Sequence, residues 1–304
     1  MTTARVASVS PETKTRTTPR SCNLCGEQTD IRPQYRKGNF SVVRCRACSL
    51  VYVDELPTQA GLEEIYSPSF FEVGEKFAGA SKSPSLVNAH QRIDELVALP
   101  EVQLGRWLDV GCATGDFLLA AASVVSEAEG VEMSAYAAER AKTRGVSSVH
   151  TGDFLDVELE DSAFDFVSMW DYIEHVTDPV ANLRRAFQIL RPGGYLALTT
   201  GDIESLAARF MGRYWHLMIP PKHLYFFSPK TIEEMLTNAG FRSISITRPG
   251  KRVPFDFVTW KLTNLFLPNA GPLALRINKV LRLGKLAPFV NLYDIMTVYA
   301  RKQR

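Results

Sequence analysis

A glycine-rich turn at residues 108–117 is the stretch whose residue types most clearly suggest chemistry. It reads Leu-Asp-Val-Gly-Cys-Ala-Thr-Gly-Asp-Phe, so that a short apolar strand leads through the turn into a helix. Such a turn lets a ligand approach the backbone closely, and the N-terminus of the helix offers free N–H groups. Gly111, Ala113 and Gly115 are spaced two apart and Asp116 follows, which departs from the G-x-G-x-x-G spacing of a dinucleotide site. The spacing therefore argues against an NAD site.

Other elements follow the turn in order. Glu132 lies about 20 residues after the first glycine, where a ribose diol needs a bidentate acceptor. Asp153-Phe154 comes next, then an apolar strand that ends in Trp170-Asp171, and then the turn and strand of 191–199. Together with the turn, this series resembles the class I S-adenosylmethionine (SAM) methyltransferases, whose first motif is D/E-x-G-x-G-x-G. The one departure is alanine at the middle glycine.

The resemblance implies a fold, a cofactor and the residues that bind it. The fold is an α/β doubly wound, seven-stranded Rossmann-like sheet, and the cofactor is SAM. Glu132 would hold the ribose, and Asp153 would lie near the adenine amino group. The cofactor-binding residues implied are Asp109, Gly111, Cys112, Ala113, Gly115, Glu132, Met133, Asp153, Phe154 and Trp170.

Candidate catalytic residues occupy two segments near the expected cofactor. Methyl transfer to a hydroxyl needs a base, and three of the five histidines lie after the fourth strand or in the loop after the fifth: His175, His216 and His223. The sequence favours His223 as a metal-free general base, with His175 second and Asp171 as a third catalytic candidate.

A second resemblance raises an alternative. Asp171-x-x-Glu174-His175 is similar to the acidic-x-x-Glu-His motif of the ubiquinone-biosynthesis O-methyltransferases and the small-RNA 2′-O-methyltransferases. That resemblance implies a divalent metal held by Asp171, Glu174, His175 and His223. The departure is aspartate at the first position, which shortens the reach of that side chain.

Four of the five cysteines form two C-x-x-C pairs, Cys22/Cys25 and Cys45/Cys48. Each pair can supply two thiolates from one knuckle, and two knuckles complete a tetrahedral zinc site. A redox C-x-x-C normally stands alone beside a βαβ unit, and disulfides need an oxidising compartment. We therefore expect a structural Zn²⁺, because four cysteines leave no open coordination position.

Composition, cysteine spacing and hydrophobic periodicity together predict the order of domains along the chain. A disordered leader (1–20) precedes a zinc ribbon (21–56) and a helical linker (57–99) with helices at 62–66 and 86–99. The SAM-binding core (100–250) alternates strands and helices; a helical cap insertion (251–288) and the last core strand (289–304) follow. The expected core strands are 106–111, 128–133, 147–151, 164–170, 194–200, 241–248 and 292–302. The expected helices are 114–125, 135–144, 179–190 and 229–239.

Composition narrows the choice of partners. The 304 residues are 45% hydrophobic and 22% charged with a net charge of +2, which gives no global attraction to nucleic acid or to a membrane. With no signal peptide or transmembrane run, we expect a cytoplasmic protein. Residues 251–285 carry seven lysines and arginines against the single acid Asp256, among large apolar residues. We expect a packed helical cap with a solvated basic face there; peripheral contact with a membrane or a lipid-linked substrate is the alternative.

Across residues 21–245, the chain resembles bacterial small-molecule and sugar methyltransferases that carry an N-terminal Cys₄ zinc ribbon. The resemblance implies methyl transfer to a hydroxyl of a sugar, a glycan precursor or a secondary metabolite. Two alternatives stay open. One is an RNA methyltransferase whose ribbon grips RNA through basic residues, namely Arg32, Arg36, Lys37, Arg44 and Arg46. The other is a non-catalytic SAM-binding protein.

Overall fold

A computed structural model describes residues 20–58, 61, 84–266, 271–281, 283 and 286–304. Its centre is a seven-stranded sheet of strand order β10-β13-β8-β7-β4-β5-β6. The strands are β4 (Arg106–Val110), β5 (Glu127–Glu132), β6 (Ser148–Thr151), β7 (Phe164–Trp170), β8 (Leu190–Gly201), β10 (Arg242–Thr247) and β13 (Ile295–Arg301). Strand β13 runs antiparallel to both neighbours, and the pairs among β4 to β8 are parallel. The predicted fold class is confirmed, and each predicted core strand is present.

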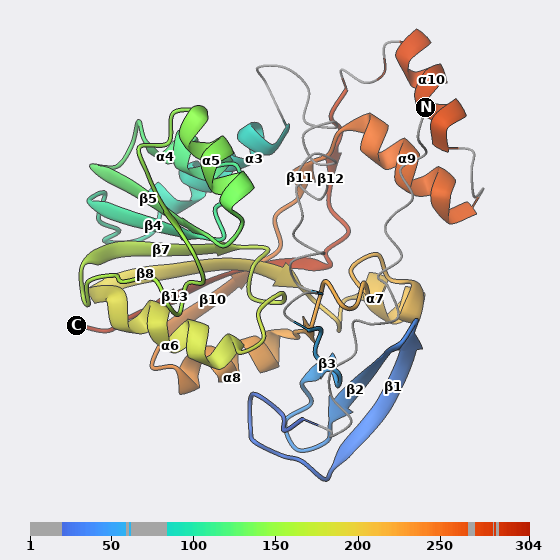
Figure 1. The fold of residues 1–304 in the computed structure, drawn as a ribbon, viewed down its shortest axis with the longest axis horizontal. Helices are drawn as coiled ribbons and strands as arrows, with labels where there is room; N and C mark the ends of the chain where they lie inside the picture. The colour runs from blue at the N-terminus through green and yellow to red at the C-terminus, as the bar shows by residue number, and fades with distance from the viewer. Residues whose placement is uncertain (1–19, 59–60, 62–83, 267–270, 282, 284–285) are drawn as a thin grey trace.

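Helices cover both faces of this sheet (Figure 1). One face carries α3 (Pro84–Val97), α4 (Asp116–Ala121) and α5 (Ala135–Thr143); the other carries α6 (Pro179–Ile189) and α8 (Pro229–Asn238). Local sequence explains where α6 and α8 begin: Asp178 and Ser228 are N-caps, each followed by proline at the first helical position. The predicted leader and the predicted helix at 62–66 lie outside the described residues, Arg20 excepted.

A separate small sheet forms at the cysteine-rich end. It contains β1 (Ile31–Lys37), β2 (Phe40–Cys45) and β3 (Val51–Val53), in the order β1-β2-β3-β9. The fourth strand, β9 (Tyr225–Phe226), comes from the loop that follows β8, and it pairs antiparallel with β3. Residues 40–44 and 50–53 are strand-like in sequence, but local patterns predicted neither β1 nor this pairing. The pairing brings together segments about 170 residues apart, beyond the reach of local patterns.

The predicted helical insertion before the last strand is present as α9 (Phe255–Phe266) and α10 (Gly271–Val280). Two short strands that were not predicted, β11 (Lys251–Arg252) and β12 (Phe289–Val290), pair to form its stalk. Figure 1 shows the insertion beyond the edge of the central sheet where β7 and β8 end. The same edge carries α7 (Leu206–Met211) and the short helix η2 (Gly212–Tyr214). None of the described helices is long and apolar enough to cross a membrane.

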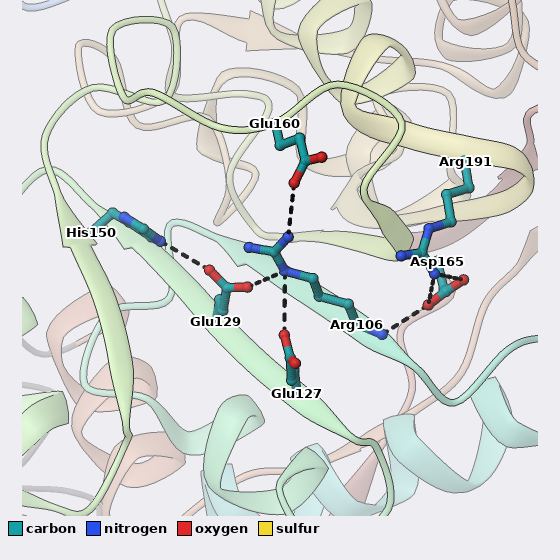
Figure 2. A network of polar contacts seen from close by, with 7 residues as sticks. All are labelled: Arg106, Glu127, Glu129, His150, Glu160, Asp165 and Arg191. Atoms are coloured by element: carbon teal, nitrogen blue, oxygen red, sulfur yellow. Dashed lines mark hydrogen bonds and ion pairs between the residues drawn. The ribbon is translucent and has the colours of Figure 1, made fainter.

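The opposite edge, where the parallel strands begin, holds a polar network (Figure 2). The Arg106 guanidinium donates to Glu129 at 2.5 Å, and Glu129 also contacts His150 at 3.0 Å. Asp165 accepts from the Arg106 backbone N–H at 2.8 Å and from Arg191 at 3.0 Å. These hydrogen bonds and ion pairs link five neighbouring strands, β8, β7, β4, β5 and β6. Ligands of open α/β sheets bind at the carboxyl ends of strands, so we assign this network to stability.

Candidate functional site

The glycine-rich turn joins β4 to α4 and has the backbone conformation that its sequence suggested. Gly111, Ala113 and Gly115 have φ values of 71°, 48° and 84°. A Cβ atom at Gly111 would lie 2.6 Å from the Tyr172 ring, so a side chain there is excluded as well as strained. Ala113 adopts the left-handed conformation as a non-glycine residue, at a cost of about 1 kcal/mol. The turn places its backbone at the end of β4, and the N–H groups of Gly111 and Cys112 are bonded to the Val131 carbonyl of β5.

Glu132 ends the neighbouring strand β5 and braces this turn. Its two carboxylate oxygens accept hydrogen bonds from the backbone N–H groups of Ala113 at 2.9 Å and Ser134 at 2.8 Å. The side chain is buried, and burial raises the pKa of Glu132. Because a carboxylate has about four acceptor positions, the two backbone bonds leave capacity for a ribose diol.

The other residues implied for cofactor binding differ in their burial and in their contacts. Asp109 is buried and accepts a 2.6 Å bond from Ser168, and burial raises the pKa of Asp109 to about 7. Cys112 packs against Gly130, where a Cβ would lie 2.6 Å from its sulfur. Cys112 can therefore offer a cofactor its backbone rather than its thiol.

The remaining implied residues flank the same edge. Met133 is 46% exposed and Phe154 is buried. Asp153 accepts the Leu155 backbone N–H at 2.9 Å. Trp170 packs edge-on against Phe117, with ring centroids 5.2 Å apart. No single described contact ties these side chains into one cluster.

Arg92 belongs to this edge although the sequence did not single it out. It extends from α3, with its guanidinium 4.4 Å from the centroid of the Trp170 ring and 3.6 Å from the Asp171 carboxylate. It also lies within electrostatic reach of Asp109. Its only sequence signal was a cation on the helix before the turn, which could equally mark a solvated face.

Glu174, His175 and His223 form a compact cluster beyond the end of β7. One potential ligand atom from each lies within 4.8 Å of the others. The two imidazole rings meet edge-to-face at 4.7 Å. Backbone pairing explains the approach, because the Glu174 carbonyl accepts the Leu224 N–H at 2.7 Å. The sequence placed these residues in two segments, and the structure brings the segments together.

Burial controls the electrostatics of this cluster. It lowers the pKa of His223 to about 3 and that of His175 to about 4, so both rings are neutral at pH 7. Burial, together with nearby Asp171, raises the pKa of Glu174 to about 8. The buried Glu174 Oε2 has no hydrogen-bond partner among the described residues. Each of these pKa shifts favours the neutral form of the side chain.

The hydrogen bond of His223 determines which of its nitrogens can react. Its Nδ1 lies 2.8 Å from the Leu217 carbonyl, which can only accept, so Nδ1 carries the proton. Nε2 therefore holds the lone pair, which could accept a proton or coordinate a metal. Glutamate with two histidines is a donor set that suits a divalent transition metal.

The other two candidates lie outside this group of three donors. Asp171 accepts a 3.0 Å bond from Thr199, and its side chain is 48% exposed. Although desolvation by the surrounding protein opposes it, the cations Lys251 and Arg92 hold the pKa of Asp171 below its usual value. His216 lies 3.3 Å from Asp294 instead. The structure thus joins His175 and His223 with Glu174, and places Asp171 beside them.

The four ribbon cysteines form the second candidate metal site. Their sulfur atoms all lie within 4.8 Å of one another, with Cys22–Cys48 and Cys25–Cys45 each at 3.5 Å. Disulfide sulfurs would lie about 2.05 Å apart. Tetrahedral zinc with bonds of about 2.3 Å separates its sulfurs by roughly 3.8 Å. The four thiols could therefore hold one zinc ion.

The ribbon is attached to the loop that carries His223. Beyond the β3–β9 pairing, the Val53 N–H donates to the Leu224 carbonyl at 2.8 Å. The carbonyl of Leu224 thus accepts a hydrogen bond from the ribbon, and its N–H donates one to Glu174. In the first knuckle, Asn23 accepts the Val180 N–H at 3.1 Å and donates to Asp178 at 3.0 Å, at the start of α6.

Comparison with known proteins agrees with this geometry. Residues 86–246 match the protein family described as the methyltransferase domain. The chain belongs to this family. It carries a methyltransferase domain, and its fold is similar to that of solved SAM-dependent methyltransferases.

Individual relatives are more distant. A ubiquinone biosynthesis O-methyltransferase of Thiobacillus denitrificans is 28% identical over 152 residues, which are 46% of this chain and 66% of that protein. The chain thus spans slightly less than two thirds of that relative. A SAM-dependent methyltransferase of Thermotoga maritima has a similar fold (TM-score 0.52, 23% identity, 80% of this chain and 99% of that one). So has phosphoethanolamine N-methyltransferase 2 of Haemonchus contortus (TM-score 0.53, 17% identity, 89% and 71%).

Proposed function

We propose that this methyltransferase transfers the methyl group of SAM to a hydroxyl of a small-molecule acceptor. The observation that carries this proposal is the cluster of buried Glu174 and His223 with half-buried His175 beyond the end of β7. The name of the Thiobacillus relative, an O-methyltransferase, supports the same chemistry. Acceptors of this class include a sugar hydroxyl, a glycan precursor and a secondary metabolite.

The cofactor side of the site would be assembled from the ends of β4 and β5 and from one helix, α3. The glycine-rich turn would place its backbone against SAM, and Glu132 would accept from the ribose hydroxyls. Arg92 would pair with the carboxylate of the cofactor's methionine part, since a guanidinium matches a carboxylate in a bidentate manner. Positioning of both reactants is the main contribution of the protein, because the sulfonium of SAM is itself the electrophile.

The acceptor hydroxyl must lose a proton as it attacks. The unprotonated Nε2 of His223 can take that proton, but a pKa of about 3 makes it a weak base. We propose that Glu174, His175 and His223 hold a divalent cation, which when bound lowers the pKa of an acceptor hydroxyl. The Oε2 of Glu174, which has no hydrogen-bond partner in the part of the chain that the structure describes, and the fixed tautomer of His223 fit this role.

Contacts of the ribbon cations favour a small molecule over RNA. Lys37 donates to the carbonyl oxygens of Met218 and Arg213. Arg44 lies 4.0 Å from Glu204, and Arg46 lies 3.5 Å from Asp30. Three of the five basic residues considered for RNA are thus engaged with this protein's own residues.

The proposed reaction is tested with labelled SAM and a panel of acceptors. The panel contains catechols, sugars, hydroxylated metabolites and structured RNA, each assayed with and without added divalent cations. Label is expected on a hydroxyl of a small molecule. Transfer to RNA alone, or to an amine alone, would contradict the proposal, and absence of transfer despite SAM binding would support a binding protein.

We predict that Glu132→Ala weakens SAM affinity by roughly ten- to a hundredfold, equivalent to about 1.5–3 kcal/mol for a charge-assisted pair. Calorimetric titration with SAM measures this change. Because Glu132 also bonds the Ala113 and Ser134 N–H groups, Glu132→Gln is the companion variant that keeps side-chain volume. Unchanged SAM affinity in both variants would show that Glu132 does not contact the ribose.

A further inference from the structure

The insertion between β10 and β13 exposes apolar side chains along one side of α10. Leu273, Ile277 and Val280 are 62%, 50% and 81% exposed, and Leu281 just after the helix is 59% exposed. At about 100° per residue these four positions fall within an arc of roughly 100°. They therefore form one continuous stripe, which we call the α10 stripe.

The orientation of α10 is determined by its other side. Asn278 is buried and donates from Nδ2 to Asp256 at 2.9 Å and to Thr259 at 3.0 Å, both on α9. These bonds turn the Asn278 side of α10 toward α9. The α10 stripe is left facing away from the described part of the insertion.

Two positively charged side chains lie on the same helix as the α10 stripe. Arg276 and Lys279 are exposed and lie on one side of the stripe, roughly 40° and 100° around the helix from Val280. Residues 251–285 hold seven of the chain's 35 lysines and arginines but one of its 33 acids, and that acid is the Asp256 bonded by Asn278. An apolar stripe beside uncompensated cations is the pattern of a helix that lies in the interface of an anionic bilayer.

The insertion also reaches the active-site edge. Its first strand, β11, is tied to α3, because the Arg252 N–H and carbonyl each form a 2.9 Å bond with Asn88. Lys251, beside Arg252, acts electrostatically on Asp171 and Glu174. Figure 1 shows α9 and α10 standing beyond this edge of the sheet.

We infer that the α10 stripe with Arg276 and Lys279 docks the enzyme on an anionic lipid membrane. Docking would hold the active-site edge near the bilayer, so that the methyl acceptor is a hydroxyl compound carried in the membrane. This second step rests on the proposed function, whereas membrane binding itself does not.

Vesicle co-sedimentation of the full chain tests the inference. We expect binding to mixed phosphatidylcholine–phosphatidylglycerol vesicles, weakened by salt, and much weaker binding to phosphatidylcholine alone. Arg276→Glu/Lys279→Glu is expected to reduce the partition coefficient by roughly thirtyfold or more, since each cation near an anionic surface contributes about a fivefold factor. Ile277→Ser/Val280→Ser should reduce it by at least about tenfold.

Matched controls use the same substitutions elsewhere. Arg140→Glu/Lys142→Glu removes two cations from α5, and Leu104→Ser removes a 41%-exposed side chain next to the start of β4. Both controls should bind vesicles as the wild type does. No vesicle binding by the wild type, or equal losses in the α10 variants and the controls, would overturn the inference. A dimer in sedimentation velocity that Ile277→Ser/Val280→Ser dissociates, without vesicle binding, would assign the stripe to a second copy instead.

SAM affinity and transfer to a water-soluble acceptor, measured on the same samples, separate the two proposals. Intact transfer without vesicle binding overturns only the membrane inference. Vesicle binding without transfer to any acceptor overturns only the proposed function.

Discussion

Replacing His223 with glutamine is expected to lower kcat by about 10²- to 10⁴-fold, while SAM affinity and melting temperature stay close to those of the wild type. The reason is that Nε2 of His223 is the one nitrogen of this ring left to act, because Nδ1 is committed to the Leu217 carbonyl. Glutamine retains polarity and approximate size. Steady-state kinetics with the acceptor identified by the panel, together with calorimetry, measures the effect.

His216→Gln is the matched control, since His216 lies in the same loop but contacts Asp294. It should change kcat by no more than a few-fold. If Glu174, His175 and His223 hold a divalent cation, metal analysis gives a second measurement. The metal bound in addition to the ribbon zinc should be lost in His223→Gln and kept in His216→Gln. Equal metal content with low kcat would return the role to a metal-free base, and kcat within a few-fold of wild type would remove His223 from catalysis.

Replacing Cys45 with serine is expected to release zinc and to lower turnover by roughly a hundredfold, while SAM binding is retained. Loss of a thiolate ligand costs much of the metal's contribution to folding, so the ribbon sheet should loosen. Strand β3 then no longer holds β9, and the loop with His223 loses its backbone bonds to the ribbon while it keeps those to Glu174. A displacement of about 1 Å at a reacting group can cost roughly a hundredfold in rate.

Metal analysis, SAM calorimetry and single-turnover kinetics on the same preparation distinguish this outcome. Cys112→Ala is the control, because Cys112 lies in the core away from the ribbon and should leave the zinc in place. Zinc retained in Cys45→Ser would show that the four cysteines are not its ligands. Full turnover after zinc loss would show that the ribbon does not position the His223 loop.

The core could be predicted from sequence because its signals are local. A mainly apolar run such as Phe164–Trp170, interrupted by Asp165 and Ser168, is buried on both faces of a parallel sheet, so its strand is visible in the sequence. Caps at Asp178 and Ser228 show where α6 and α8 begin. By contrast, β11 and β12 are two-residue strands that pair with each other, and no periodicity marks so short a pair.

The candidate site was predictable in its residues but not in its arrangement. Histidine and carboxylate at 171–175 and at 223 could be recognised by type, yet nothing in their spacing shows that Asp171 bonds Thr199 rather than joining the other donors. Arg92 was missed for a related reason: a surface cation and a site cation look alike on an isolated helix. The two kinds of cation can be distinguished only in the folded chain, where α3 lies beside the end of β7 and Arg92 contacts Trp170 and Asp171.

Local sequence by itself determined the order of strands and helices, the glycine-rich turn, the Cys₄ pairs and hence the family. These features depend on backbone freedom, ligand spacing and hydrophobic periodicity, which act over a few residues. Tertiary structure alone decided that β9 completes the ribbon sheet and that Glu174 meets His223 through Leu224. Those contacts join segments about 50 to 170 residues apart, and backbone hydrogen bonding specifies them only once the whole sheet has been assembled.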